Sequence, residues 1–425
     1  MTAPSRIASD RHPCFNRHSS GSCGRVHLPV APKCNLKCNY CNRKYDCVNE
    51  SRPGVTSAVL KPHQALEYMH KVLEAEPRIT VAGIAGPGDP MANPEQTLET
   101  MRLLKEHYPH MLFCLSSNGL AMPAYLDDLA SLGVTHATVT MNAVDPKIAA
   151  KIYAWAMDGK VVYRGHAAAE LLLSRQLEAV AGLKTRGIAV KINSIVIPGI
   201  NEHHVVAVAK AAEHLGADLQ NLIPMHPNEG TPFGHLTETP GAVIKSLRSQ
   251  AGTHIEQMTH CRRCRADAVG LLDKDLSGAC AGLLTTCAKL APAMNTRRPH
   301  VAVATREGML VNQHLGEAAT LQIWTDSGGS YELVEERAAP SAGCGPGRWE
   351  ALADLLSDCN TLLAAALGDT PRKILSARGI KPVEAGGFIQ HALETVYTGG
   401  DTDTLKTPRR KAAASGCSGG GGGCG

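Results

Sequence analysis

The stretch VHLPVAPKCNLKCNYCNRKYDC (residues 26–47) joins an apolar run to a cluster of closely spaced cysteines. Residues 26–32 predict a β-strand, and Cys34, Cys38 and Cys41 follow it at the spacing C-x3-C-x2-C. Three thiolates on one short loop can bind three irons of a four-iron cluster and leave the fourth iron open. A closed structural metal site generally supplies four ligands. The loop therefore predicts an open iron–sulfur cluster; a zinc loop or free thiols are the alternatives.

Five more strand-like runs follow, and segments that favour helix, such as 61–76 and 174–187, lie between them. Apolar strands that alternate with helices predict a parallel sheet covered by helices. Six such units predict a partial (β/α)6 barrel, in which function collects at the C-terminal ends of the strands. The five runs are residues 78–86, 111–119, 135–143, 189–199 and 219–227.

A second, smaller α/β domain is expected after the barrel, because strand-like and helix-like runs resume at His300. The tail is rich in glycine and serine and cannot bury a core, so we expect it to be disordered. The predicted organisation is an N-terminal extension (1–24), the barrel (25–275), a linker (276–298), the second domain (299–400) and the tail (401–425).

Composition narrows the function classes. The chain has 425 residues, a net charge of +4 and 4% aromatic residues, which argues against nucleic-acid binding. No apolar run reaches the ~18 residues that a membrane span needs. The N-terminus has no apolar core of a signal peptide, so a cytoplasmic protein is expected. In a reducing compartment, the 15 cysteines are more often metal-binding or catalytic than paired in disulfides.

The cysteine motif after the first strand of a β/α barrel resembles that of the radical S-adenosylmethionine (SAM) superfamily. The resemblance implies that SAM chelates the open iron, and that one electron then cleaves SAM to a 5′-deoxyadenosyl radical. It also implies SAM contacts from the glycine-rich turn GIAGPGDP (83–90) and from polar residues at the strand ends, although such residues are also common in ordinary turns. The residues concerned are Tyr40, Gly86, Gly88, Asp89, Ser116, Asn118, Asn142, Asn193 and Ser194.

A longer pattern resembles the radical SAM enzymes of nitrogenase cofactor biosynthesis. It comprises HPCF around Cys14, the motif segment, PMHP (224–227) and HCRRC (260–264), and it covers about residues 10–275. The segment VNQHLGEA (311–318) resembles the cofactor-binding domains of the NifX type. The resemblance implies an enzyme that fuses two four-iron clusters and inserts a SAM-derived carbide and an extra sulfur. The product is the eight-iron precursor of the nitrogenase cofactor.

The resemblance also implies ligands for the two substrate clusters. Cys14, Cys261 and Cys264 form one expected set, since a C-x2-C pair needs a third ligand. Cys47 and Cys114 form the other, with a histidine as the third ligand; His27 is preferred and His12 is the rival. Cys114 also fits a strand as a small core residue.

Glu50 and Arg52 follow Cys47 closely and are candidate catalytic residues that contact substrate or handle protons. An ion pair in a capped loop is the alternative. His314 is a candidate for docking the finished cluster in the second domain, against the alternative of an exposed loop histidine. Four further cysteines are expected to be ordinary thiols: Cys280, Cys287, Cys344 and Cys359. Cys417 and Cys424 in the glycine-rich tail are expected to be incidental reactive thiols, with the binding of metal or iron–sulfur units as the alternative.

The implied partners are donors of iron–sulfur clusters, downstream cofactor carriers or scaffolds, and an electron donor such as ferredoxin. Two other functions stay open. One is a radical SAM enzyme with auxiliary clusters that modifies peptide or RNA, and the other is a carrier of iron–sulfur clusters without enzymatic activity.

Overall fold

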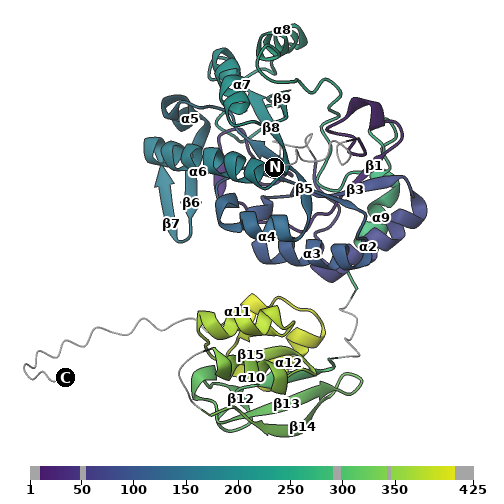
Figure 1. Cartoon of the computed structure of the whole chain (residues 1–425), viewed down its shortest axis with the longest axis vertical. Helices are drawn as coiled ribbons and strands as arrows, with labels where there is room; N and C mark the ends of the chain where they lie inside the picture. Colours follow the sequence, from purple (N-terminus) through teal and green to yellow (C-terminus); the bar gives the residue numbers. More distant parts are fainter. Residues whose placement is uncertain (1–9, 48–53, 291–297, 342–345, 407–425) are drawn as a thin grey trace, which may run out of the picture. The chain divides into compact units, whose positions relative to one another are not determined.

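The computed structural model describes residues 10–47, 54–290, 298–341 and 346–406. The chain divides into two compact units, Met1–Leu290 and Ala291–Gly425 (Figure 1). Among the described residues, no helix combines the length and the apolar character needed to cross a membrane.

A seven-stranded sheet forms the centre of the first unit, in the order β10-β1-β3-β4-β5-β8-β9. The six strands from β1 to β9 in this order are parallel, and β10 pairs antiparallel with β1. Each parallel strand falls within or next to a run predicted from the sequence, so the partial (β/α)6 barrel is confirmed. The strands are β1 (Gly24–His27), β3 (Ile79–Ile84), β4 (Leu112–Ser117), β5 (Val134–Thr140), β8 (Ala189–Val196), β9 (Leu219–Pro224) and β10 (Val269–Gly270).

Helices cover the outer face of the curled sheet (Figure 1). The first shows why they form: Pro62 occupies the first turn, and the Gln64 side chain accepts from the Lys61 backbone N–H (2.8 Å) at the start of the helix. Tyr68 and Val72, four residues apart, then point into the core from one face. The helices are α2 (Pro62–Ala75), α3 (Pro94–His107), α4 (Leu126–Ser131), α5 (Pro146–Ile152), α6 (Gly165–Thr185), α7 (Val205–His214) and α8 (Gly241–Ala251).

A small three-stranded sheet supports the cysteine loop. Strand β2 (Leu36–Cys38) lies inside the cysteine motif and pairs with β6 (Tyr153–Asp158), which pairs in turn with β7 (Val161–Arg164). The register places Cys38 opposite Tyr153. The sequence analysis did not predict this hairpin. It fixes the backbone of the motif from outside the barrel.

Two expectations about the connecting segments are wrong. The expected linker, 276–298, begins with helix α9 (Ser277–Cys287), which packs against α2 and buries Cys280, Leu284 and Cys287 in the core. The tail was expected to be disordered from Asp401, but a 3-10 helix, Thr402–Leu405, buries Leu405 in the second unit. The rest of the tail, with Cys417 and Cys424, lies outside the described residues, as does Cys344.

The second unit is a smaller α/β fold, as predicted. Its five-stranded sheet has the order β14-β13-β11-β15-β16, and one hydrophobic core lies on each side of it. Helices α10 (Gly347–Leu355), α11 (Asp369–Ala377) and α12 (Ile389–Tyr397) cover the sheet. The strands are β11 (His300–Val303), β13 (Thr320–Asp326), β14 (Tyr331–Ala338), β15 (Cys359–Ala364) and β16 (Lys381–Glu384), with a separate pair β12 (Leu310–Val311) and β17 (Gly387–Phe388).

Candidate functional site

The inner face of the barrel is polar. Successive side chains of a strand point to opposite faces, so residues two apart on one strand line the same wall. On β4 this wall contains Cys114 and Ser116, and on β8 it contains Lys191 and Asn193. A barrel packed only as a core would place apolar side chains here. The inner wall is therefore built to face polar or charged ligands.

Two adjoining cavities lie in the first unit. The first, which we call the loop cavity, spans about 460 Å³, including space open to solvent. The second, the lumen cavity, spans about 620 Å³ on the same basis. Ala85 and Ser116 line both. A ligand in one cavity is therefore next to a ligand in the other.

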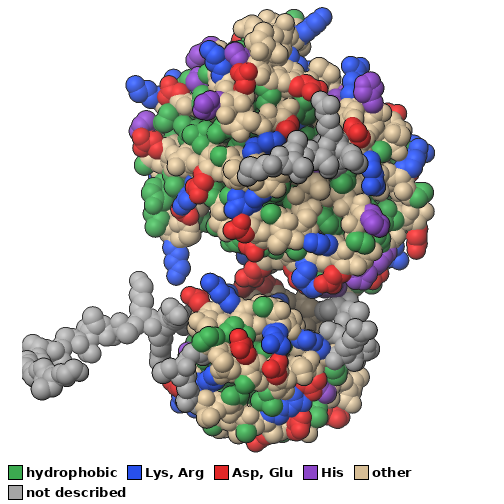
Figure 2. Space-filling model, viewed as in Figure 1, with side chains coloured by type: hydrophobic (Ala, Val, Ile, Leu, Met, Phe, Trp, Pro, Cys, Tyr) green, Lys and Arg blue, Asp and Glu red, His purple; other side chains and the backbone are tan. Residues whose placement is uncertain are grey.

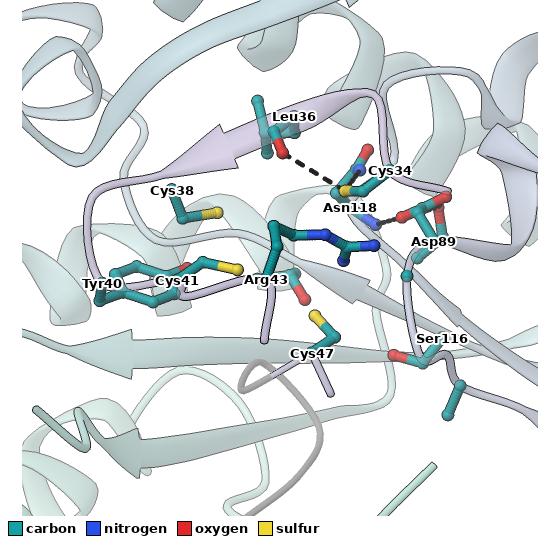
Figure 3. A pocket seen from close by; sticks show the side chains of 14 residues that line it. Cys34, Leu36, Cys38, Tyr40, Cys41, Arg43, Cys47, Asp89, Ser116 and Asn118 are labelled. Carbon is teal, nitrogen blue, oxygen red and sulfur yellow. Dashed lines mark hydrogen bonds between the residues drawn. The ribbon is translucent and has the colours of Figure 1, made fainter. Parts of the chain in front are cut away.

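The loop cavity contains the three cysteines of the motif. Figure 3 shows the sulfur atoms of Cys38 and Cys41 turned toward the space that the Arg43 side chain also enters, with Cys34 on another side. Cys47 lines the same cavity. Of the predicted SAM contacts, those that line it are Tyr40, Gly88, Asp89, Ser116 and Asn118.

The glycine-rich turn is packed directly on the cysteine loop. A side chain at Gly88 would place its Cβ 2.1 Å from the Lys33 carbonyl oxygen, just before Cys34. Asn93 holds the same residue from both sides, since its side chain accepts from the Lys33 N–H (3.1 Å) and donates to the Lys33 carbonyl (2.9 Å). Only glycine allows this close approach of two backbones.

Asp89 joins the turn to the end of β4. Its buried carboxylate accepts hydrogen bonds from the Ser117 hydroxyl (3.0 Å) and from the backbone N–H of Asn118 (2.6 Å) and Met91 (2.9 Å). Burial nevertheless raises its pKa, and the hydrogen bonds oppose the shift. Asp89 thus orients Asn118, whose side chain donates to Asn35 in the cysteine loop (2.8 Å).

Four predicted SAM contacts do not line the loop cavity. Two of them make hydrogen bonds inside the protein, and the other two lie in the lumen cavity or in the glycine-rich turn. Asn142 is fully buried; it donates to the Tyr40 hydroxyl (2.8 Å) and accepts from the Ile195 N–H (2.8 Å). Ser194 donates to the Met141 carbonyl and faces away from the cavities. Asn193 lines the lumen cavity, not the loop cavity. Gly86 lies in the turn with φ +148°, a conformation that favours glycine.

The loop cavity fits a four-iron cluster with SAM. Three thiols line the cavity, and the Ser116 hydroxyl is buried without a hydrogen-bond partner among the described residues. Burial raises the pKa of Cys34 to about 12 and the pKa of Cys38 well above its ordinary value. The metal-free thiols are therefore protonated at neutral pH, and iron must displace those protons on binding.

The spacing of the possible ligand side chains bears on whether the site holds a single metal ion. Among the described residues, no three His, Cys, Asp or Glu side chains converge closely enough to hold one metal ion. A cluster, in contrast, holds its thiolates around a larger body. The three thiols that line the loop cavity are therefore compatible with an iron–sulfur cluster.

The lumen cavity brings together most of the predicted ligands of the substrate clusters. Its walls include Cys14 from the N-terminal segment, Cys261 and Cys264 from the segment after α8, Cys114 from β4, and His27 from β1. Burial raises the pKa of Cys14 to about 12. Segments far apart in the sequence thus supply thiols to one cavity.

The structure places the two cysteines of one predicted pair in different, adjoining cavities. Cys47 was expected to share a cluster with Cys114, but Cys47 lines the loop cavity and Cys114 lines the lumen cavity. A hydrogen bond holds Cys47 at the loop cavity: its N–H donates to the Pro87 carbonyl (3.0 Å) in the glycine-rich turn. Glu50 and Arg52 lie outside the described residues.

The hydrogen bonds distinguish His27 from His12. His27 Nδ1 lies 2.9 Å from the Arg265 carbonyl oxygen, which can only accept, so Nδ1 carries the proton and Nε2 is left with a lone pair. His12 Nδ1 accepts from the Cys14 N–H (3.2 Å), so the proton of a neutral His12 lies on Nε2. Burial, followed by the Arg25 charge, lowers the pKa of His27 to about 4. His27 is thus a neutral imidazole with a free lone pair.

The sequence analysis missed four cationic side chains at the cavities, one of which is Arg262 in the lining of the lumen cavity. Arg43 lines the loop cavity, and Arg25 and Lys191 line the lumen cavity. Arg25 lies in β1 and Lys191 in β8, and both side chains are buried. Charged residues are almost never buried without a partner, so a basic residue inside an apolar strand was a usable signal.

Residues 28–212 match the model of the Radical SAM superfamily, and residues 297–399 match that of the Dinitrogenase iron-molybdenum cofactor family. The chain is 47% identical to the FeMo cofactor biosynthesis protein NifB of Chlorobaculum tepidum, over 97% of this chain and 98% of that protein. It is 41% identical to the protein of the same name from Klebsiella pneumoniae, over 89% of this chain and 87% of that protein.

The barrel and its three-cysteine loop define a radical SAM enzyme that carries a second domain of the nitrogenase cofactor type. Its biological process is nitrogen fixation. The chain belongs to the NifB family of FeMo cofactor biosynthesis proteins. This confirms the resemblance seen in the sequence and goes against a carrier without enzymatic activity.

Proposed function

We propose that this enzyme fuses two four-iron clusters and inserts a SAM-derived carbide and an extra sulfur, to make the eight-iron precursor of the FeMo cofactor. One observation carries the proposal: the three-cysteine loop cavity adjoins a second cavity lined by Cys14, Cys114, Cys261 and Cys264. A radical SAM enzyme that acts on peptide or RNA needs no thiol-lined cavity inside its barrel.

The residues of the loop cavity hold the resident cluster and SAM. Cys34, Cys38 and Cys41 ligate the cluster, which, when bound, supplies the electron that cleaves SAM to a 5′-deoxyadenosyl radical. Asn118 and Gly88 bind and orient SAM on the side of the glycine-rich turn. Ser116 lines both cavities, and its hydroxyl has no hydrogen-bond partner among the described residues. It contacts the ligand in the loop cavity and the ligand in the lumen cavity.

The residues of the lumen cavity hold the substrate clusters. Cys14, Cys261 and Cys264 bind one of them. Cys114 and His27 bind the other, with Cys47 reaching toward it from the adjoining cavity. Two or three protein ligands leave irons open, which suits clusters that must fuse and leave. Glu50 and Arg52 are proposed to contact substrate or move protons there.

The proposal includes a cytoplasmic location and protein partners. Cluster donors and downstream cofactor carriers exchange iron–sulfur units with the enzyme, and an electron donor such as ferredoxin reduces it. Lys and Arg side chains are interspersed with Asp and Glu on the face in view in Figure 2, which supports the absence of a nucleic-acid partner. In the second unit, His314 is exposed and is proposed to dock the finished cluster.

Methyl-labelled SAM tests the proposal. Incubated anaerobically with the reconstituted, reduced enzyme, it is expected to yield S-adenosylhomocysteine, 5′-deoxyadenosine and label in the extractable iron–sulfur product. Cys264→Ala removes a lumen ligand but leaves the loop cavity intact. This variant is expected to lose the labelled cluster and still to form 5′-deoxyadenosine.

The matched control is Cys287→Ala, which removes a cysteine that is buried in the core and lines neither cavity. It is expected to label the cluster as the parent does. Label recovered in peptide or RNA, or a Cys264→Ala variant that labels the cluster normally, would contradict the proposed function.

A further inference from the structure

Arg25 is a buried cation in the wall of the lumen cavity. Its side chain projects from β1, and the residue is 2% exposed. Nη1 donates to the carbonyl oxygens of Gly270 (2.5 Å) and Leu271 (3.1 Å), and Nη2 donates to the sulfur of Cys264 (3.1 Å). Its Nε is buried and has no hydrogen-bond partner among the described residues.

The guanidinium lacks a carboxylate among its hydrogen-bond acceptors in the described part of the chain, which are two carbonyls and one sulfur. Arginine stays charged in proteins, and a buried charge is costly unless an opposite charge compensates it. The carbonyls carry no net charge. Asp275 also acts on Arg25 electrostatically, and the one hydrogen-bond acceptor of the guanidinium that can itself become anionic is the Cys264 sulfur, which lines the cavity.

The Lys and Arg side chains that line the lumen cavity are not matched by acidic ones. Lys191 on β8 and Arg262 inside the C-x2-C motif add two more cationic side chains. Among the described residues, the lining contains no Asp or Glu. The loop cavity differs, because Asp89 lines it. The lumen cavity is thus electropositive and fits an anionic ligand such as a thiolate-bound iron–sulfur cluster.

We propose that Arg25 is a positioning residue for the substrate cluster held by Cys14, Cys261 and Cys264. It donates a charge-assisted N–H···S hydrogen bond to the Cys264 thiolate and keeps a positive charge beside the cluster. The inference rests on the proposed function, because it takes the cluster in the lumen cavity as given. Hydrogen bonds to sulfur and local charge set both the retention and the reduction potential of a cluster.

The planar fork of arginine is what this position needs. One arm is anchored on the turn after β10, and the other reaches Cys264, so the side chain ties the C-x2-C segment to β1. A lysine keeps the charge but presents one nitrogen on a flexible stem, and it cannot hold both ends. Charge and anchoring can therefore be separated by two substitutions.

The test uses the full chain with Cys38→Ala, which removes a ligand of the SAM cluster and leaves the substrate clusters for spectroscopy. Arg25→Gln and Arg25→Lys are compared in this parent after anaerobic reconstitution. The readouts are the midpoint potential from an EPR-monitored redox titration and the rate of iron release to a chelator. Arg78→Gln, which removes a cation from an ion pair with Glu76 that lines neither cavity, is the control.

Arg25→Gln is expected to shift the midpoint potential to more negative values and to release iron severalfold faster. Arg25→Lys is expected to keep the parent's potential but to release iron faster, and Arg78→Gln to match the parent in both. If Arg25→Gln does not fold, as judged by circular dichroism, the iron-release rate of Arg25→Lys decides. An unchanged potential and release rate in Arg25→Gln, or an unchanged rate in Arg25→Lys, would overturn the inference alone. A parent that retains no iron would overturn the proposed function together with it.

Discussion

Cys38→Ala is expected to abolish the reductive cleavage of SAM. Cys38 ends β2, is 6% exposed and lines the loop cavity between its two partner cysteines in the sequence. Burial, followed by the neighbouring thiols of Cys41 and Cys34, raises the pKa of its thiol, and a side-chain hydrogen bond with Tyr40 opposes the rise. Two remaining thiols cannot hold three irons, so the cluster that reduces SAM is lost. The measurement is 5′-deoxyadenosine formed under reducing, anaerobic conditions.

Cys280→Ala is the matched control for this prediction. Cys280 is also buried, at 4% exposure, but it packs in the core between α9 and α2 and lines neither cavity. Removing its sulfur is expected to cost about 1 kcal/mol of stability and to leave SAM cleavage at the parent's rate. SAM cleavage by Cys38→Ala at a rate near that of Cys280→Ala would show that the three-cysteine loop is not the SAM site.

Gly88→Ala is expected to displace the cysteine loop. The new Cβ would lie 2.1 Å from the Lys33 carbonyl oxygen and 2.8 Å from that of Pro32, and both are backbone atoms that cannot rotate away. Overpacking of this kind typically costs about 1–3 kcal/mol. A displacement of ~1 Å at a reacting centre can cost about 100-fold in rate, so SAM cleavage is expected to fall by that order. Denaturant unfolding and 5′-deoxyadenosine formation measure the two effects.

Gly278→Ala controls for the change from glycine to alanine itself. Gly278 lies in helix α9, and a Cβ there has no neighbour within 4 Å. Alanine in a helix is favoured over glycine by roughly 0.5–1 kcal/mol, so this variant is expected to be as stable as the parent or more stable. Wild-type SAM cleavage by Gly88→Ala would mean that the turn and the loop move independently, against the structure.

The barrel was predictable because its strands are apolar runs long enough to stand out between helical segments. The β6–β7 hairpin was missed because its exposed residues, among them Val161 and Val162, face solvent at the edge of the unit and give no buried pattern. Helix α9 was read as linker because SGACAGLLTTC consists mainly of small residues. Packing against α2, rather than its own pattern, stabilises it.

The sequence predicted which types of residue form the site. It was less informative about which of them lie together in one cavity. The C-x3-C-x2-C spacing located the loop cavity, since all three cysteines lie on one short segment. The separation of Cys47 from Cys114 depends on how the glycine-rich turn meets the loop, which no local pattern reveals. The choice between His27 and His12 depends on the hydrogen bond to the Arg265 carbonyl, 238 residues away in the sequence.

The most direct test of the account is the iron and acid-labile sulfide content per chain after anaerobic reconstitution. The central claim is that one barrel holds a SAM cluster in the loop cavity and two substrate clusters next to it. Three four-iron clusters predict about twelve irons and about twelve sulfides per chain. About four of each, with SAM cleavage intact, would contradict the claim and leave a radical SAM enzyme with a single cluster.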